Sequence, residues 1–380
     1  MMVINLLLFI LFCMIVANFG VYSLLLKIIA RFKNVDHKID QAYRPTVSLL
    51  IAAYNEGKFL EQKLTNTLEL DYPKDLFNIV LVSDGSTDNT NEVARQFESR
   101  GVTVIINSPN QGKATALNTG MEVINSDIVV LSDANTMYEK NAIRNLARHF
   151  TDPDIGAVSG KVVLLNEELS YSDAENTYYS VEHTIQQLES QTGNLIGADG
   201  AMYAIRRELF RPLQSDTLLD DFVLSMGVIQ QGKRLIFDPE ALGYEKNLAE
   251  IDSEFNRKVR IVAGGIQSLQ RKTSWPPKGQ TLTAVKYIFH KLIRWIIGPV
   301  IVAFIVLFLI KGAITGSAIT LALATLALVG YPLLRLLTKL FPSLQNFKPV
   351  SLLQYMLVMI SASVVGCYKA LVSRQRISWR

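Results

Sequence analysis

IVLVSDGS (residues 79–86) and IVVLSDAN (residues 128–135) share one pattern, a run of apolar β-formers that ends in an aspartate and a turn. Continuous runs of Val, Ile and Leu are typical of parallel strands that are buried on both faces of a sheet. Open α/β sheets bind ligands in the loops that follow the carboxyl ends of such strands. Asp84 and Asp133 therefore predict a site for a nucleotide, a metal ion or both.

Strands and helices alternate around these two stretches. Apolar runs predict strands over residues 47–53, 77–82, 102–106 and 128–131, and the segments between them carry helical patterns. This order predicts an α/β fold with a mainly parallel central sheet and helices on both faces.

Apolar residues are concentrated at the two ends of the 380-residue chain, which is 49% hydrophobic and has a mean hydropathy of +0.22. The net charge of only +4 argues against a nucleic-acid partner. Cys13 and Cys367 both lie in apolar end segments, so neither a disulfide framework nor a zinc site is expected. The four histidines lack ligand spacing, and we interpret them as surface or interface residues.

The N-terminal apolar stretch, residues 3–26, is long enough to cross a hydrocarbon core of roughly 30 Å as a helix. A signal peptide is the alternative interpretation. It would need a basic leader, whereas the first charged residue is Lys27. The basic residues that follow place the next domain in the cytoplasm by the positive-inside rule.

Three further spans are predicted at roughly residues 288–310, 312–334 and 350–371, which makes this a multi-pass protein of the cell membrane in contact with its lipid. Arg294 and Trp295 at the start of the first span are interpreted chiefly as an anchor at the headgroup level. Basic residues near the C-terminus leave the side of that end open. The predicted segments are an N-terminal transmembrane helix (1–27), a basic juxtamembrane linker (28–45), a cytoplasmic α/β domain (46–272), an interfacial linker (273–287), a transmembrane region of about three helices (288–372) and a basic tail (373–380).

Six short motifs follow one another within the predicted α/β domain. They are AAYNEG (52–57), SDGSTD (83–88), NQGKATALNTG (110–120), SDAN (132–135), LLDDF (218–222) and RKVRI (257–261). In this order and between apolar ends, they resemble the family 2 glycosyltransferases, in particular the membrane-bound cellulose, chitin, hyaluronan and poly-N-acetylglucosamine synthases. The resemblance implies a GT-A fold, which is one nucleotide-sugar-binding α/β domain.

The first three motifs carry the residues that the resemblance assigns to the donor nucleotide. Tyr54 and Glu56 follow the first strand and would contact the base, although Glu56 could simply favour a helix N-terminus. Asp84 would hold the nucleoside. Lys113 begins a helix, where backbone amides and a point charge both attract phosphate. Asn118, further along that helix, could serve either packing or function, as could Gly120.

SDAN stands where the family has its DxD metal motif. Asp133 matches the first acid, and Asn135 replaces the second. Mg²⁺ commonly uses one or two carboxylates together with substrate phosphates, so one carboxylate is sufficient in principle. The resemblance thus implies a metal-dependent enzyme that uses Mg²⁺ or Mn²⁺, with Asp133 and Asn135 as candidate ligands.

LLDDF contains two adjacent acids at the start of a predicted helix. Side chains at adjacent helix positions point about 100° apart, so Asp220 and Asp221 cannot do the same job. The resemblance makes Asp221 the catalytic base and leaves Asp220 on the acceptor side. Two helix-capping acids are the alternative interpretation.

RKVRI stands where the family has QxxRW. Arg260 matches the arginine and could clamp the pyrophosphate, while Arg257 replaces the glutamine on the acceptor side. Ile261 replaces the tryptophan, so the aromatic platform for an acceptor sugar is missing and processive polymerisation is less secure. Asp199 in ADGA (198–201) is a further candidate for the acceptor site.

The sequence therefore predicts an inverting glycosyltransferase, a hexosyl- or N-acetylhexosaminyl-transferase. It would move a sugar from a UDP-sugar donor to a growing glycan at the cytoplasmic face, in the synthesis of an extracellular polysaccharide. The alternative is transfer of a single sugar to a lipid-linked acceptor. A membrane-tethered dinucleotide oxidoreductase would need GxGxxG after the first strand, where the chain has AAYNEGKF. A non-catalytic sugar-nucleotide-binding membrane subunit is a remote alternative.

Overall fold

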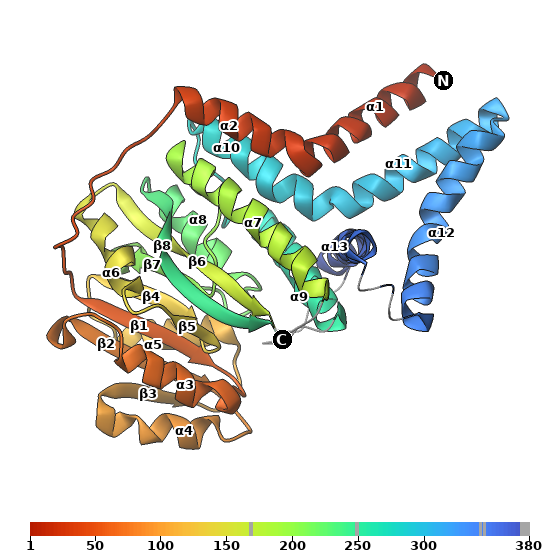
Figure 1. Ribbon diagram of the computed structural model, residues 1–380. Coiled ribbons are helices and arrows are strands. Elements are labelled where there is room, and N and C mark those ends of the chain that lie inside the picture. Colours follow the sequence, from red (N-terminus) through yellow and green to blue (C-terminus); the bar gives the residue numbers. More distant parts are fainter. Residues whose placement is uncertain (167–169, 248–250, 342–343, 345–346, 373–380) are drawn as a thin grey trace.

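The computed structural model describes residues 1–166, 170–247, 251–341, 344 and 347–372, and is built around one eight-stranded sheet (Figure 1). The strand order is β3-β2-β1-β4-β7-β6-β8-β5. Neighbours from β3 to β4 are parallel, as are β6 and β8, while β7 and β5 each pair antiparallel. The strands are β1 (Val47–Ala53), β2 (Phe77–Asp84), β3 (Val102–Asn107), β4 (Ile128–Asp133), β5 (Thr136–Tyr138), β6 (Ile155–Asn166), β7 (Met202–Arg206) and β8 (Arg234–Asn247).

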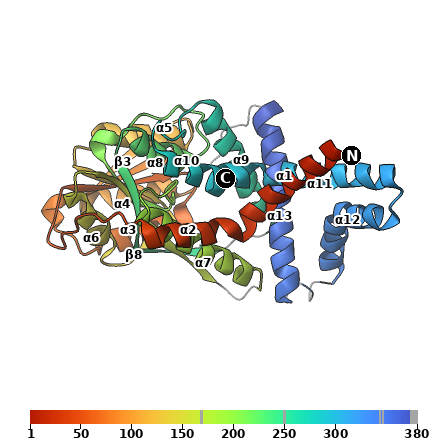
Figure 2. The same cartoon turned by 90° about the horizontal axis from the view of Figure 1, so that it is seen from above.

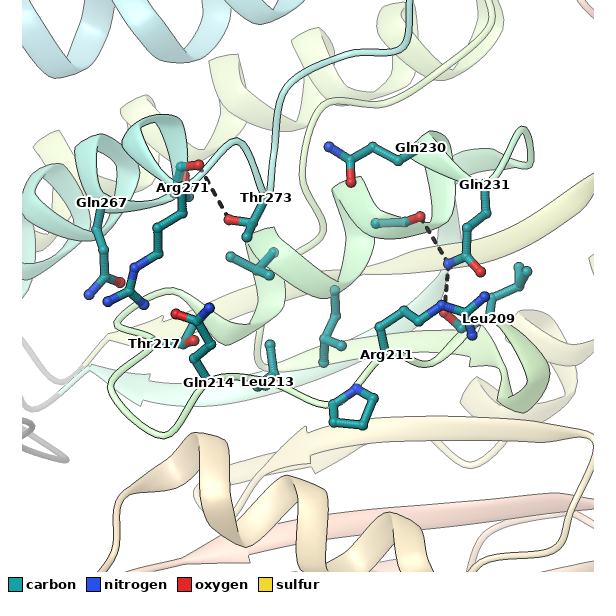
Figure 3. Close-up of a pocket in the computed structure, with 15 residues that line it drawn as sticks. Leu209, Arg211, Leu213, Gln214, Thr217, Gln230, Gln231, Gln267, Arg271 and Thr273 are labelled. Carbon is teal, nitrogen blue, oxygen red and sulfur yellow. Dashed lines mark hydrogen bonds between the residues drawn. The ribbon is translucent and has the colours of Figure 1, made fainter.

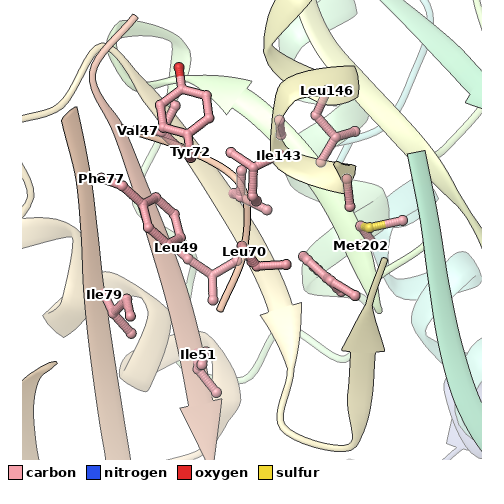
Figure 4. Packing of buried hydrophobic residues seen from close by; sticks show 14 of the residues in the cluster. Val47, Leu49, Ile51, Leu70, Tyr72, Phe77, Ile79, Ile143, Leu146 and Met202 are labelled. Carbon is pink, nitrogen blue, oxygen red and sulfur yellow. The ribbon is translucent and has the colours of Figure 1, made fainter. Parts of the chain in front are cut away.

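Helices cover both faces of this sheet, as the continuous apolar strands predict. Every residue of β1 is buried, and its side chains alternate between two separate apolar clusters. Figure 4 shows part of one of them, in which Val47, Leu49 and Ile51 share a cluster with Ile143 and Leu146 of α6. The helices on that face are α3 (Gly57–Leu68), α4 (Thr90–Gln96) and α6 (Ala142–Ala147), and those on the other are α5 (Lys113–Val123), α8 (Asp220–Gln230) and α9 (Ile251–Gln270).

Of the remaining helices, α7 packs against β8 and β6 and also contacts α2, whereas α1, α11, α12 and α13 extend from one side of the α/β domain (Figures 1 and 2). α1 runs beside α11, and α13 packs against both α9 and α11. These helices are α1 (Met2–Val16), α2 (Tyr22–Phe32), α7 (Ser170–Gln191), α10 (Thr281–Tyr287), α11 (Ile293–Thr315), α12 (Ala318–Leu340) and α13 (Lys348–Val372).

Two helices among the described residues are long and apolar enough to cross a membrane, Thr281–Thr315 and Pro349–Val372. A third span is formed if Ala318–Gly330 and Pro332–Leu340, which meet at a bend of 49°, count as one. Near the N-terminus, α1 is apolar but only 15 residues long, and a kink at Gly20 separates it from α2. The N-terminal span and the segment boundaries stay predictions, and the basic tail (373–380) lies outside the described residues.

Trp295 corrects one expectation, because it is a core residue and not a headgroup anchor. Its side chain is 4% exposed and meets the Phe222 ring edge-on at 5.4 Å. Pro299, four residues later, lacks the amide that would bond the Trp295 carbonyl in a regular helix. Ser363 of α13 donates its hydroxyl to that carbonyl at 2.6 Å instead. A neighbouring helix thereby satisfies the polar group that the proline frees, as apolar surroundings require.

Candidate active site

The carboxyl edge of the parallel strands brings the predicted donor residues together. β1 lies between β2 and β4, with Ala53 opposite Ser83 and Ala52 opposite Asp133. Asp84, the last residue of β2, and Asp133, the last of β4, therefore flank the loop that follows β1. The pattern of a buried strand ending in an aspartate thus correctly located one edge of the sheet.

Asp84 organises the start of α5. Its fully buried carboxylate accepts hydrogen bonds from the backbone amides of Gln111 at 3.0 Å and Gly112 at 2.7 Å, and from Asn107 Nδ2 at 3.3 Å. A carboxylate can accept several such bonds, and charge makes each one stronger than a neutral bond. Asp84 therefore shapes the turn that places Lys113, and its contact with a nucleoside stays a prediction.

The loop after β1 is held against the loop after β2. Asn55, which has a left-handed φ of 54°, accepts a hydrogen bond from the Thr87 amide at 2.8 Å. Asp88 accepts bonds from the Gly57 amide at 3.1 Å and the Thr90 amide at 3.0 Å. Asp88 thus serves both the start of α4 and the AAYNEG loop. These contacts fix the backbone around Tyr54 and Glu56, the candidates for binding the base.

Lys113 is the centre of an ionic cluster that joins two distant motifs. Its ammonium lies 2.7 Å from Asp133 Oδ1 and 3.5 Å from Asp220 Oδ2. Burial disfavours the charged form of Lys113, but the negative charges of Asp133 and Asp220 outweigh the effect of burial. The pKa of Lys113 is therefore raised above its ordinary value. Lysine, aspartate and the start of α8 therefore meet where the resemblance places the donor diphosphate.

Asp221 lies beside this cluster, in an environment that favours its neutral form. Its Oδ1 accepts the Phe222 amide at 2.7 Å, and Gly200 passes so close that an added Cβ would lie 2.8 Å from Oδ2. Burial and then the Asp220 carboxylate raise the pKa of Asp221 to about 7. Burial likewise raises the pKa of Asp199, and the negative charge of Asp133 raises it further. A carboxyl that titrates near neutrality is suited to general base catalysis.

The two arginines of RKVRI lie on α9. Arg257 Nε bonds Glu254 Oε2 at 2.7 Å, and its guanidinium also reaches the Tyr179 hydroxyl at 3.3 Å. The charge of Arg257 lowers the pKa of Asp199 against the larger effect of burial, so the two side chains lie near each other, and their place on the acceptor side stays a prediction. The role of Arg260 as a pyrophosphate clamp stays a prediction.

Two residues at the site escaped the sequence analysis. Lys63 is fully buried beneath the SDAN loop, where its ammonium lies 2.7 Å from Ser132 Oγ and 2.5 Å from the Thr136 carbonyl. Burial lowers the pKa of Lys63 to about 7. A lysine within the apolar stripe of α3 was the signal that could have identified it. Glu245 comes from β8, opposite Thr136, and burial followed by the charge of Asp133 raises its pKa to about 7.

Asn118 and Gly120 serve packing. Asn118 exchanges two hydrogen bonds with the backbone of Leu213, at 2.8 and 2.9 Å, and so ties α5 to the loop that leads into α8. An added Cβ at Gly120 would lie 2.3 Å from Leu50 Cδ1, so the buried Leu50 side chain would have to move to admit a side chain there.

A hollow of about 290 Å³ lies behind α8, between the loop that contains Leu213 and α9 (Figure 3). Its glutamines mostly hold loops: Gln267 donates to the Asp216 carbonyl and Gln231 to the Leu209 carbonyl. None of the predicted site residues lines it. The hollow is therefore separate from the edge of the sheet that carries the acidic cluster.

Comparison with known proteins agrees with this geometry. Residues 48–213 match Glycosyl transferase family 2. The matched stretch, residues 48–213, therefore has the sequence of a family 2 glycosyltransferase domain. A poly-β-1,6-N-acetyl-D-glucosamine synthase of Staphylococcus aureus is 26% identical over 245 residues, 63% of this chain and 58% of that protein. A probable glycosyltransferase of Bacillus subtilis is 30% identical over 216 residues, 53% of this chain and 51% of that protein. The chain thus matches little more than half the length of these relatives.

The fold of this chain is shared with a solved structure. A mannosyltransferase from Pyrobaculum calidifontis, in complex with GDP-Man and Mn²⁺, superposes with a TM-score of 0.71 at 24% sequence identity. The match covers 96% of this chain and 99% of that one. The predicted GT-A fold, with its mostly parallel sheet and apolar C-terminal helices, is therefore confirmed.

Proposed function

We propose that this protein is an inverting glycosyltransferase, which transfers a hexose or an N-acetylhexosamine from its donor to a growing glycan. The transfer inverts the configuration at the anomeric carbon of the donor sugar. The donor of first choice is a UDP-sugar, and the reaction takes place at the cytoplasmic face of the cell membrane. The observation that carries the proposal is the cluster of Lys113, Asp133 and Asp220, with Asp221 beside it. The Staphylococcus relative, by its name, makes a glycan, which supports extracellular polysaccharide synthesis as the role.

On the donor side, Tyr54 and Glu56 contact the base. Asp84 helps to hold the nucleoside, because it fixes the turn at the start of α5. Lys113 lies at the first turn of α5, where the backbone amides and the ammonium both favour phosphate. Arg260 is proposed as a clamp on the pyrophosphate because guanidinium matches phosphate geometry.

On the acceptor side, Asp221 takes the proton of the attacking hydroxyl. The hydroxyl oxygen forms a bond to the anomeric carbon while the bond from that carbon to the nucleoside diphosphate breaks. A base with a pKa of about 7 is substantially ionised at neutral pH and still basic enough to accept the proton. Asp199, Asp220 and Arg257 position the acceptor around it.

The site could hold a divalent cation, Mg²⁺ or Mn²⁺, if the substrate supplies most of the metal ligands. Among residues that the structure describes, no group of three His, Cys, Asp or Glu side chains could hold a metal ion. Asp133 supplies one carboxylate and Asn135 an amide, so donor phosphates would complete the shell. When bound, the cation would stabilise the charge of the departing diphosphate. The Mn²⁺ in the Pyrobaculum complex supports this proposal.

Ile261 favours a second candidate, transfer of a single sugar to a lipid-linked acceptor. It stands at the position where the synthases have the tryptophan of QxxRW, and it offers no aromatic face for a glycan. Trp295 does not replace that platform, because it is 4% exposed and packed against Phe222. A non-catalytic subunit is disfavoured because Asp133 and Asp221 are both present.

A donor panel tests the proposal. The purified full-length protein is incubated with UDP- and GDP-sugars and with Mg²⁺, Mn²⁺ or a chelator, and released nucleoside diphosphate and product mass are measured. We expect one UDP-sugar to be consumed only when a divalent cation is present. A ladder of products indicates chain growth, and one added sugar indicates the second candidate. Release from no donor would refute the enzymatic proposal.

A further inference from the structure

The helix that leaves the α/β domain toward the membrane begins with an irregular turn. Between α10 and α11, residues Ile288–Leu292 form a π-helical turn. Such turns change which way the following side chains point, and they occur frequently at functional sites. This one carries two adjacent basic side chains, His290 and Lys291, whose surroundings differ.

Most polar groups around this turn are paired. His290 bonds Glu182 Oε1 at 2.5 Å and Glu189 Oε1 at 2.9 Å. Arg294 lies 2.6 Å from Glu182 Oε2, and Lys286 donates to the Glu189 carbonyl at 2.7 Å. These groups therefore use their hydrogen-bonding capacity within the protein.

Lys291 is the exception. Among the described residues it makes no hydrogen bond and no ion pair. Its side chain extends to the acceptor side of the site, where Nζ lies 6.0 Å from the centre of the Phe222 ring. A Cβ added at Gly197 would lie 3.5 Å from Lys291 Cε. Phe222 directly follows the candidate base Asp221, and Gly197 begins the loop that carries Asp199. An unpartnered ammonium thus lies next to both acceptor-side acids.

We propose that Lys291 determines acceptor specificity by binding a phosphate group that joins the acceptor sugar to a membrane lipid. This rests on the proposed function in its second form, transfer of a sugar to a lipid-linked acceptor. The half-buried Lys291 ammonium loses hydration, and the acids around it, Glu182, Glu189 and Asp221, act on its charge without a direct ion pair. A ligand anion in direct contact would compensate the lost hydration. A phosphate suits lysine, which binds it as a point charge.

The position of Lys291 in the chain favours a lipid as the source of that phosphate. Thr281–Thr315 is one of the two helices long and apolar enough to cross a membrane, and Lys291 lies in its first third. Long cationic side chains near the end of a spanning helix reach the depth of the headgroups, where lipid phosphates lie. An acceptor sugar on a lipid phosphate could therefore present a hydroxyl to Asp221 and its phosphate to Lys291.

Three matched acceptors test the inference with the donor that the panel identifies. They are N-acetylglucosamine joined through a phosphodiester to a long alkyl chain, the alkyl glycoside without phosphate, and soluble N-acetylglucosamine 1-phosphate. The full-length enzyme in lipid nanodiscs is compared with K291M, K291R and K311M, the last removing a lysine near the far end of the same helix. Donor hydrolysis without acceptor and the unfolding temperature report whether each variant is intact.

We expect K291M to raise KM for the phosphodiester acceptor about tenfold or more, as loss of one charge-assisted contact implies, with KM for the alkyl glycoside unchanged. K291R should restore most of the affinity, and K311M should match the unmodified enzyme. Equal effects of K291M on charged and neutral acceptors, or no effect, would overturn the inference. A soluble phosphate as effective as the lipid form would overturn the lipid source. If the unmodified enzyme releases nucleoside diphosphate but prefers the neutral acceptor, this inference fails while the proposed function stands.

Discussion

The donor edge of the sheet and the junction with the apolar helices are assembled in different ways. At the donor edge, each motif follows one strand, and parallel strands end side by side. Asp84 and Gly112 are 28 residues apart, and Lys113 and Asp133 are 20 apart. At the junction, Glu189 bonds Tyr22 from 167 residues earlier and His290 from 101 residues later. Short-range sequence patterns therefore specify the donor edge, whereas packing of distant helices creates the junction.

The largest effect is expected at Asp221, which lies between the donor edge and the junction with the apolar helices. We expect Asp221→Asn to reduce transfer roughly hundredfold to ten-thousandfold, because a general base contributes about that much, while donor binding is kept. Initial rates and donor binding by calorimetry provide the measurement. Asp216→Asn is a matched control, because Asp216 is more exposed and its ion pair with Arg271 is remote from the cluster. Equal turnover by the enzyme and Asp221→Asn would show that Asp221 is not the base.

The next effect concerns stability of the junction. Glu189 is fully buried and accepts bonds from Tyr22, from His290 at 2.9 Å and from the Ile196 amide at 3.0 Å. Glu189→Gln removes the charge that these donors surround, so we expect a loss of about 3 kcal/mol in the free energy of unfolding. Thermal unfolding in detergent measures it. Tyr22→Phe should cost only about 1 kcal/mol, since it deletes one bond and keeps the ring. Unchanged stability of Glu189→Gln would mean that the junction does not depend on this network.

The smallest expected effect is a change in pH dependence at the cluster. Asp221 must be ionised to act as a base, so transfer should rise as pH increases through about 7. Asp220→Asn removes the like charge that contributes to this raised pKa, so the rising limb should move to lower pH. The test is to measure kcat between pH 5 and 9, a range of about four units around the pKa, and to compare the pH at which kcat rises. The comparison does not depend on the maximum kcat of the variant. A limb that stays in place or moves upward would contradict this role for Asp220.

The fold and the donor edge were predictable for a common reason. Runs such as residues 79–82 are apolar at every position, which suits only a strand buried on both faces, and a polar turn after such a run marks the ligand edge. Lys63 and Glu245 could not be located in this way. Lys63 sits beneath the SDAN loop from an earlier helix, and Glu245 reaches Thr136 from a strand 109 residues away in the chain.

Trp295 shows the same limit in the apolar helices. Hydropathy and the adjacent Arg294 were consistent with a headgroup anchor, but the ring packs on Phe222, and its carbonyl bonds Ser363 of another helix. Hydropathy measures how apolar a segment is, and it contains no information about whether a side chain faces lipid or another helix.

By itself, the sequence determined the α/β class, the order of the motifs and the two aspartates at the strand ends, because strand burial and turn chemistry are local properties. Tertiary structure alone decided that Lys113 bridges Asp133 and Asp220, that Asp221 is buried beside them, and that Lys291, next to Phe222, forms no hydrogen bond or ion pair with any residue the structure describes. These relations depend on distances between segments far apart in the chain. Such distances are set by how the helices and the sheet pack, and residue spacing in the sequence does not encode them.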